Sequence, residues 1–175
     1  MAYRTIEVEQ HGDYATVTMN RPQRRNALSV DHMVELTEAF RALGRTSAKG
    51  IILAGRGPVF CAGHDFADMV GASLGSMREL LQTCVELMDT IQSVPQVVLA
   101  RVHALATAAG CQLVAQCDLA VAASTARFAV SGVNLGLFCS TPSVALSRNL
   151  SRKAAFEMLA TGDFISAQDA QAKGL

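Results

Sequence analysis

The sequence has no tryptophan, few charged residues and no long apolar run. Charged residues make up 17% of the 175 residues, and 15 basic residues balance 15 acidic ones. Without a basic stripe, nothing indicates nucleic acid as a partner. No apolar run reaches the roughly 18–20 residues that a membrane span needs. Residues 1–7 resemble neither a secretory signal nor a basic transit peptide, so the composition predicts a packed globular domain.

The cysteines also lack the patterns that signal a cross-link or a metal. There are five of them, an odd number, and none forms a CxxC pair. Neither a disulfide framework nor a zinc site is indicated, and we expect no metal. The positions are Cys61, Cys84, Cys111, Cys117 and Cys139. A reducing cytosol suits such a chain, so we predict a cytoplasmic location.

The length fits one domain over residues 1–175, because no low-complexity linker divides the chain. Folding a chain of this size buries roughly 70% of its unfolded surface. Hydrophobic residues make up 50% of the sequence. We therefore expect some apolar surface to remain on the monomer, and self-association to cover it.

Hydrophobic periodicity predicts strands and helices in alternation. A hairpin is expected over residues 5–19, and a helix capped by Ser29 and stopped by Gly44 follows it. The remaining strands are predicted at 50–54, 97–100 and 118–123, and the remaining helices at 76–94, 108–115, 142–150 and 153–160. Residues 55–72 are expected to form a long loop. This order is typical of an α/β fold with right-handed crossovers.

Two segments rich in small residues follow buried strands, at 55–66 and 104–113. Each places backbone N–H groups without side-chain cover at the end of a strand, where ligands bind in open α/β sheets. Two such donors converging on one carbonyl would form an oxyanion hole, in which one donor is worth roughly 3–4 kcal/mol. The alternative is that small residues only allow close packing of helix and strand. The residues alone favour neither interpretation.

The order and spacing of several motifs resemble those of the crotonase (enoyl-CoA hydratase/isomerase) superfamily. They are Asn20-Arg21-Pro22, Asn26-Ala27-Leu28, Phe60-Cys61-Ala62-Gly63-His64-Asp65, Ala108-Ala109-Gly110-Cys111-Gln112-Leu113, Cys117-Asp118, Gly136-Leu137 and the closing segment 161–175. The match covers essentially the whole chain. Segments 107–112 and 136–142 resemble the enoyl-CoA hydratase domain-containing subgroup most closely.

The resemblance implies a spiral of repeated ββα units that assembles into a trimer or a pair of trimers. It also implies an acyl-CoA thioester as ligand, with coenzyme A as part of the substrate and no separate cofactor. The oxyanion donors would be the backbone N–H groups of His64 and Ala109, the latter followed by Gly110. The segment Ala62-Gly63-His64-Asp65-Phe66-Ala67 would line the pantetheine path. Arg24, Arg25 and Ala27 would lie beside the nucleotide end.

Two positions depart from the family's pattern. The two glutamates that perform acid–base chemistry in the hydratases align with Gln112 and Gly132. Hydration needs one group to deprotonate water and another to protonate the α-carbon, and neither residue can do so. Gln112 can still orient a water molecule through a hydrogen bond. Standard hydratase activity, and isomerase activity through the second carboxylate, are therefore not expected.

Other polar residues are candidate substitutes. His64 titrates near neutral pH in its ordinary state, but the interpretation that it only binds is favoured over catalysis. Asp65 is expected to be a loop or helix-cap carboxylate, and Cys139 a small buried residue rather than a nucleophile. Ser140 is a further candidate near the acyl pocket. The other histidines are expected to be structural: His11 and His32 at the surface, and His103 packed or hydrogen-bonded at a strand end.

Three functional hypotheses remain open. The chain is an atypical lyase or isomerase acting on acyl-CoA in fatty acid metabolism, with decarboxylation or thioester hydrolysis as alternatives. In the second hypothesis, the chain is a non-catalytic acyl-CoA-binding or regulatory protein. Or it is an inert subunit of a mixed trimer. By resemblance, a C-terminal helical segment is expected after residue 175, and we predict that it is missing from this chain rather than from the natural protein.

Overall fold

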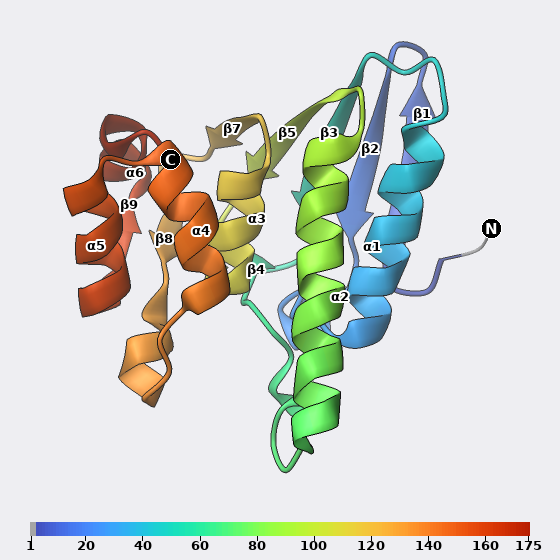
Figure 1. Cartoon of the computed structure of the whole chain (residues 1–175). Coiled ribbons are helices and arrows are strands. Elements are labelled where there is room, and N and C mark those ends of the chain that lie inside the picture. Colours follow the sequence, from blue (N-terminus) through green and yellow to red (C-terminus); the bar gives the residue numbers. More distant parts are fainter. Residues whose placement is uncertain (1–2) are drawn as a thin grey trace.

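The computed structural model describes residues 3–175 and contains two sheets with helices packed beside them (Figure 1). The larger sheet has the order β1-β2-β3-β5-β7. Its strands are β1 (Ile6–His11), β2 (Tyr14–Met19), β3 (Gly50–Gly55), β5 (Val97–Val102) and β7 (Leu119–Ala122). β1 and β2 form an antiparallel hairpin, and β3, β5 and β7 continue the sheet in parallel. The mixed α/β fold with repeated crossovers is the one that the sequence predicts.

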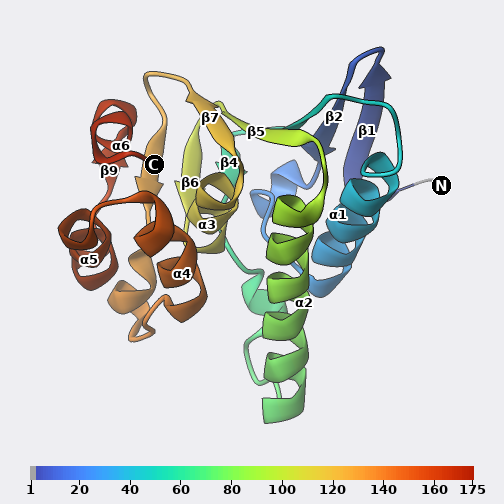
Figure 2. The ribbon, with the colours of Figure 1, turned by 45° about the horizontal axis from the view of Figure 1, so that its top comes forward.

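The second sheet consists of short strands that run beside the first (Figure 2). Its order is β4-β6-β8-β9, from β4 (Val59–Cys61), β6 (Leu105–Thr107), β8 (Arg127–Ala129) and β9 (Ile165–Ser166). The first three are parallel, and β9 is antiparallel to β8. Each is two or three residues long, too short for a period of two to be visible, so sequence reasoning missed all four.

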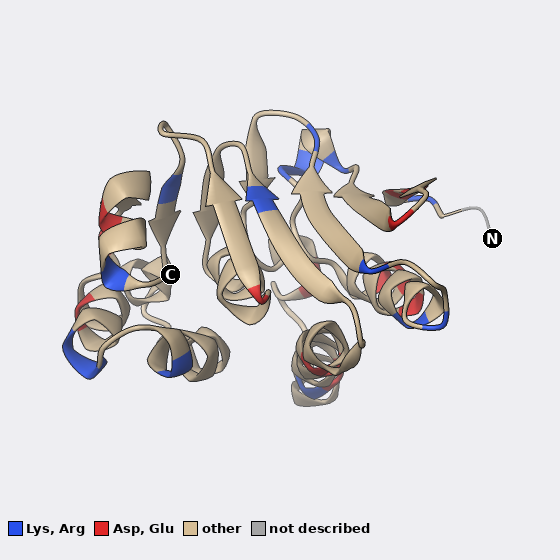
Figure 3. Cartoon of the chain, turned by 90° about the horizontal axis from the view of Figure 1, so that it is seen from above, with Lys and Arg blue, Asp and Glu red and all other residues tan. Residues whose placement is uncertain are grey.

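Helices lie on one face of the larger sheet and continue past it beside the smaller sheet, as the view from above shows (Figure 3). They are α1 (Val30–Leu43), α2 (Leu74–Ser93), α3 (Ala109–Gln116), α4 (Ser140–Asn149), α5 (Arg152–Thr161) and α6 (Ala167–Lys173). Short 3₁₀ turns lie at η1 (Pro22–Arg24), η2 (Phe66–Asp68) and η3 (Ser131–Leu135). The predicted helices are all present with shifted ends, and α6 is one that the periodicity did not reveal.

Ser29 begins α1 as expected, because its side-chain oxygen accepts a hydrogen bond from the His32 amide. The apolar stripe of the helix, including Met33, Leu36 and Phe40, is fully buried against the sheet. Burying each such side chain contributes roughly 1.5–3 kcal/mol. The same stripe arrangement in α2 completes a single apolar core that extends from β1 to α6.

The prediction of a surface position for His32 is wrong. The residue is fully buried, with Nδ1 lying 2.8 Å from the Thr5 hydroxyl oxygen. That hydroxyl donates its own proton to Glu35, so Nδ1–H is the donor from the ring. Burial, with a smaller effect of Arg21, lowers the pKa of His32 to about 4. The helical period places His32 beside the buried stripe, but its polar ring suggested the surface.

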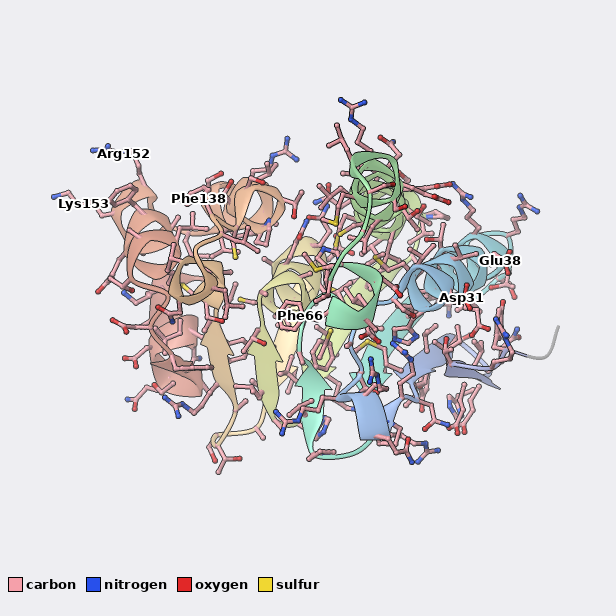
Figure 4. The ribbon with its side chains drawn as sticks, turned by 90° about the horizontal axis from the view of Figure 1, so that it is seen from below. Asp31, Glu38, Phe66, Phe138, Arg152 and Lys153 are labelled. Carbon is pink, nitrogen blue, oxygen red and sulfur yellow. The ribbon has the colours of Figure 1, made fainter. Side chains whose placement is uncertain are left out.

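The two ends of the molecule carry opposite charges at several exposed positions. Asp31 and Glu38 lie on α1, and Arg152 and Lys153 lie on α5 at the far end (Figure 4). Between them, β7 carries no charged residue and is exposed on both faces, with Leu119 57% exposed. Part of the apolar surface that the composition predicts therefore lies on this edge strand.

Candidate functional site

The first small-residue segment is held against the loop before α1. The Leu28 amide donates to the Gly63 carbonyl at 2.8 Å, and the Asp65 amide donates to the Leu28 carbonyl at 3.0 Å. The Ala62 amide also donates, to the Arg25 carbonyl at 3.1 Å. Among residues 3–175, the amide of His64 has no backbone acceptor of this kind. Like the amides of Gly63 and Phe66, it is therefore a donor without a backbone acceptor in this segment.

The second segment turns sharply into α3. Ala108 has φ 51° and ψ −121°, a conformation that costs an alanine roughly 1–3 kcal/mol. Its amide donates to the Ala129 carbonyl at 2.9 Å, and its carbonyl accepts from the Gln112 amide at 3.0 Å. The helix therefore begins at Ala109, one residue later than predicted. As the first helical residue, Ala109 has no acceptor for its amide within α3.

The two segments are in direct contact. A Cβ placed on Gly63 would lie 2.9 Å from the Ala108 Cβ and 3.3 Å from the Ala109 nitrogen. One placed on Gly110 would overlap the Cys61 carbonyl oxygen, and the Thr107 hydroxyl donates to the Ala62 carbonyl at 3.1 Å. The glycines are therefore needed for close packing, as the second interpretation holds. That packing also places the Ala109 nitrogen next to Gly63, the residue before His64.

The side chain of His64 is largely withdrawn from solvent. Among the described residues, neither ring nitrogen has a hydrogen-bond partner. Burial is the largest influence and lowers the pKa of His64, while the negative charge of Asp68 acts in the opposite direction. The ring is therefore neutral at pH 7, with a pKa below the near-neutral value expected from the sequence.

The carboxylate of Asp65 is buried and paired with arginines rather than free. It accepts from Arg24 at 2.7 Å, from Arg21 at 3.0 Å and from the Ala67 amide at 3.1 Å, which caps η2. Burial opposes its ionisation, but the hydrogen bonds from Arg24, the Ala67 amide and Arg21 outweigh that cost and lower the pKa of the carboxyl. This agrees with the expected role of a loop and cap residue.

The residues expected near coenzyme A occupy different environments. Arg24 is paired with Asp65 but half-exposed, and Arg25 is exposed with φ 52°. Ala27 is buried. Phe66, which lies after β4 on the face seen from below in Figure 4, is 55% exposed. The backbone and the arginines are thus available to a ligand, whereas Ala27 contributes to packing.

Gln112 and Gly132 stand at the positions where the resemblance places the two carboxylates of the hydratases. Gln112 is 4% exposed, and within the described part of the chain its Oε1 has no hydrogen-bond donor. A Cβ on Gly132 would lie 2.6 Å from both the Cys139 Sγ and the Leu137 carbonyl oxygen. The position of the second side chain is therefore filled by residues of the loop before α4.

Cys139 differs from the other four cysteines. It is partly exposed, whereas Cys61, Cys84, Cys111 and Cys117 are buried. Burial raises the pKa of each of these four thiols, to about 12 for the first three. The expectation that Cys139 is a buried core residue is correct only in part, because the residue packs against the core but is only partly buried.

Sequence reasoning recognised Asn26 as a motif residue but missed its structural role. Its Nδ2 lies 2.8 Å from the Arg56 carbonyl, 3.1 Å from that of Val59 and 3.0 Å from that of Phe60. Its Oδ1 accepts from the Arg21 amide at 2.9 Å. His103, expected to be hydrogen-bonded, lies with Nε2 2.8 Å from the Gly57 carbonyl. These contacts shape the loops on which the free amides depend.

Two surface hollows lie away from the free amides. One of about 570 Å³ is lined by the end of α1 and by α2, and one of about 720 Å³ by β7 and α6. No cluster of three or more metal-binding side chains occurs in residues 3–175. In the same range no helix is long and apolar enough to cross a membrane. The paired segments therefore remain the candidate site.

Comparison with known proteins decides the family. The family model described as enoyl-CoA hydratase/isomerase matches residues 9–175. The chain belongs to the enoyl-CoA hydratase/isomerase family. Its relatives place it in the enoyl-CoA hydratase domain-containing subgroup of the crotonase superfamily. The match spans both small-residue segments as well as the Gln112 and Gly132 positions, so the departures from the acid–base pattern occur within the family fold.

Individual relatives agree with this placement. The rat enoyl-CoA hydratase domain-containing protein 3, mitochondrial, is 45% identical over 98% of the chain. The chain spans 58% of the length of that protein. The crystal structure of an enoyl-CoA hydratase from Mycobacterium smegmatis is 52% identical, with a TM-score of 0.95 over 98% of this chain and 68% of that one. The human domain-containing protein 3 has the same TM-score and coverage at 43% identity.

Proposed function

We propose that this chain binds acyl-CoA thioesters and polarises the thioester carbonyl with the backbone N–H groups of His64 and Ala109. The observation that carries the proposal is the adjacency of these two free amides across the Gly63–Ala108 contact. The Ala109 amide also lies at the N-terminus of α3, where the helix dipole favours a developing negative charge. Together they would stabilise an enolate.

The path for coenzyme A would follow the segment 62–67. Its carbonyl and amide groups are fixed by the loop 25–28, so it offers a rigid edge. Arg25 is the freer of the two arginines at this edge, because Arg24 is held by Asp65. A guanidinium matches the geometry of a phosphate, and we therefore assign the nucleotide contact to Arg25 first and to Arg24 second.

The chemistry that follows binding differs from standard hydration. Gln112 and Gly132 supply no carboxylate, and the pKa of His64 is lowered by burial, so that its ring is neutral at pH 7. An atypical lyase or isomerase is therefore the first candidate. Decarboxylation needs no base, because the two amides alone stabilise the enolate that it generates. A binding or regulatory role is the second candidate, favoured by the vacant acid–base positions.

Calorimetry with matched ligands tests the binding proposal. Butyryl-CoA would be compared with S-butyl-CoA, a thioether in which the carbonyl is replaced by a methylene group. Loss of hydrogen bonds to the carbonyl is expected to weaken binding by roughly tenfold or more. Equal affinities for the two ligands, or no binding of either, would contradict the proposal.

Turnover separates the two roles. The protein would be incubated with crotonyl-CoA, malonyl-CoA and methylmalonyl-CoA, and the products followed by mass. Loss of carbon dioxide would identify a decarboxylase, gain of water a hydratase and release of free CoA a thioester hydrolase. Tight binding with no product from any of them would favour the binding role.

The expected homotrimer or hexamer belongs to this proposal as well. The exposed apolar residues of β7 favour self-association, and an inert subunit in a mixed trimer is the competing arrangement. Tight binding of butyryl-CoA by the purified chain alone would exclude the inert subunit. The cytoplasmic location stays a prediction, while the names of several relatives place those proteins in mitochondria.

A further inference from the structure

A thiol occupies the position from which the second carboxylate of the family would project. Because Gly132 has no Cβ, the Sγ of Cys139 fits where that atom would be, at a separation of 2.6 Å from its ideal position. Cys139 immediately precedes α4 and is partly exposed. The other four thiols are buried. Cys139 is therefore the cysteine that a ligand at this position can reach.

The unpartnered oxygen of Gln112 is a second, independent indication of a ligand. The Ala115 carbonyl accepts from Asn149 of α4 at 2.7 Å, so the face of α3 that carries Cys111 and Ala115 lies against α4. The Gln116 side chain donates to the Met88 carbonyl of α2 at 3.2 Å. Gln112 lies one turn before Gln116 and about 100° around the helix from Cys111.

Gln112 therefore lies on the face of α3 that turns toward α2, next to the face that carries Cys111 and meets α4. The influence of Cys139 on the pKa of Cys111 places the two thiols near each other and supports this arrangement. A buried amide oxygen without a donor costs roughly 1–3 kcal/mol. A bound group that supplies a donor at this place would remove that cost.

An apolar side chain lies next to Cys139. Phe138, which lies directly before Cys139 and is labelled in Figure 4, is 58% exposed. An acyl chain that packs on Phe138 would bring its carbons next to the thiol. Its thioester oxygen would meet the amides of His64 and Ala109 at the start of α3.

We propose that Cys139 is a nucleophile that adds to α,β-unsaturated acyl thioesters bound in this site, an inference that rests on the proposed function. The sulfur forms a bond to the β-carbon, and the π electrons move through the α-carbon to the thioester oxygen, which the two amides stabilise. The thiol proton is then delivered to the α-carbon. The product is a saturated thioether adduct that contains all atoms of the thiol and of the enoyl thioester.

Intact-mass measurement with crotonyl-CoA tests this step. One adduct with the mass of crotonyl-CoA is expected on the native chain, and Cys139→Ser is expected to abolish it. Cys84→Ala is the matched control and is expected to leave the adduct unchanged, because Cys84 is buried in α2. Addition is expected to be at least about tenfold faster than to glutathione at equal thiol concentration, because the site holds the reactants together.

A second variant keeps the test decisive if Cys139→Ser folds poorly. Gly132→Ala places a Cβ where the thiol lies and is expected to slow adduct formation at least about tenfold. Butyryl-CoA, which has no double bond, is expected to protect the thiol without reacting. Circular dichroism verifies that each variant is folded.

The outcomes separate the two proposals. A Cys139 adduct that butyryl-CoA prevents supports both. Binding of butyryl-CoA with no adduct from crotonyl-CoA overturns the thiol inference and leaves the proposed function intact. An adduct that butyryl-CoA neither prevents nor slows overturns both, since the thiol would then react outside an acyl-CoA site. An adduct that persists in Cys139→Ser also overturns the inference.

Discussion

The side-chain nitrogen of Asn26 lies 3.0 Å from the carbonyl oxygen of Phe60 and joins two segments that are 34 residues apart in the chain. Asn26 is fully buried and has φ 51°, a conformation that asparagine tolerates better than most residues. Through this contact the loop before α1 is fixed to β4, directly before the free amide of His64. The stability of the site should therefore depend on Asn26.

Replacing Asn26 with alanine is expected to lower the free energy of unfolding by roughly 3 kcal/mol. The substitution leaves buried carbonyls without a donor and places alanine in the left-handed region. Denaturant unfolding measures the effect. Asn26→Gly is the matched control, because glycine adopts φ 51° freely and loses only the hydrogen bonds. Equal stability of Asn26→Ala and the native chain would contradict this role.

Gly63→Ala is expected to weaken butyryl-CoA binding at least about tenfold. A Cβ at this position lies 2.9 Å from that of Ala108, so the two amides must move apart. Gly12→Ala provides the control, because Gly12 also has a positive φ but a Cβ there meets nothing within 4 Å. Both variants suffer backbone strain, but only Gly63→Ala should affect calorimetric affinity. An equal effect in both would remove the packing explanation.

Asp65→Asn is expected to destabilise the protein by roughly 2–3 kcal/mol at neutral pH, because two guanidinium groups lose their anion. The pKa of Asp65 is lowered by folding. The contribution of Asp65 to the free energy of unfolding is thus complete above the pKa of the carboxyl in the unfolded chain, near 4. It disappears as the pH falls through the pKa in the folded chain. The free energies of unfolding of the native chain and of Asp65→Asn should therefore become equal in acid. The exposed pair of Asp13 with Lys49 supplies a control, and Asp13→Asn is expected to change little.

Acid is expected to destabilise the chain through His32 at milder pH. Its folded pKa of about 4 lies below the ordinary value near 6.5, so its contribution is complete above pH 6.5 and is lost toward pH 4. The full loss amounts to roughly 3 kcal/mol. His32→Gln should flatten the decline of unfolding free energy between pH 7 and pH 5. An unchanged slope would show that other groups cause it.

Leu119→Lys is expected to reduce self-association, because it places a charge on the exposed apolar strand β7. Light scattering on the native chain and the variant measures the molar mass. Val34→Lys on α1 is the comparison, since Val34 is also exposed at 41% but lies away from β7. A native monomer, or equal effects of the two changes, would count against an interface at β7.

The larger sheet and its helices were predictable because their patterns are long. Ser29, Gly44 and Pro95 mark ends that the structure confirms to within a few residues. The short strands β4, β6, β8 and β9 were not predictable, because their pairing is set by tertiary contacts rather than by periodicity. Burial of His32 accompanies its hydrogen bond with Thr5, which lies before β1 and in turn donates to Glu35 of α1.

The site was predictable in outline and less so in detail. The two small-residue segments do meet, whereas the role of the His64 and Ala109 amides as oxyanion donors stays a prediction. The pairing of Asp65 with Arg21 and Arg24 joins residues 41 and 44 positions apart, which no local pattern reveals. The partial exposure of Cys139 likewise depends on the missing side chain at Gly132.

The contact between Gly132 and Cys139 also limits the routes by which such a chain can change during evolution. A glutamate introduced at residue 132 alone would meet the Cys139 sulfur and the Leu137 carbonyl before its carboxylate reached any substrate. The second carboxylate therefore cannot be introduced by a substitution at residue 132 alone. The loop before α4 would have to change first, so the contact with Cys139 restricts which residues can replace Gly132 during evolution.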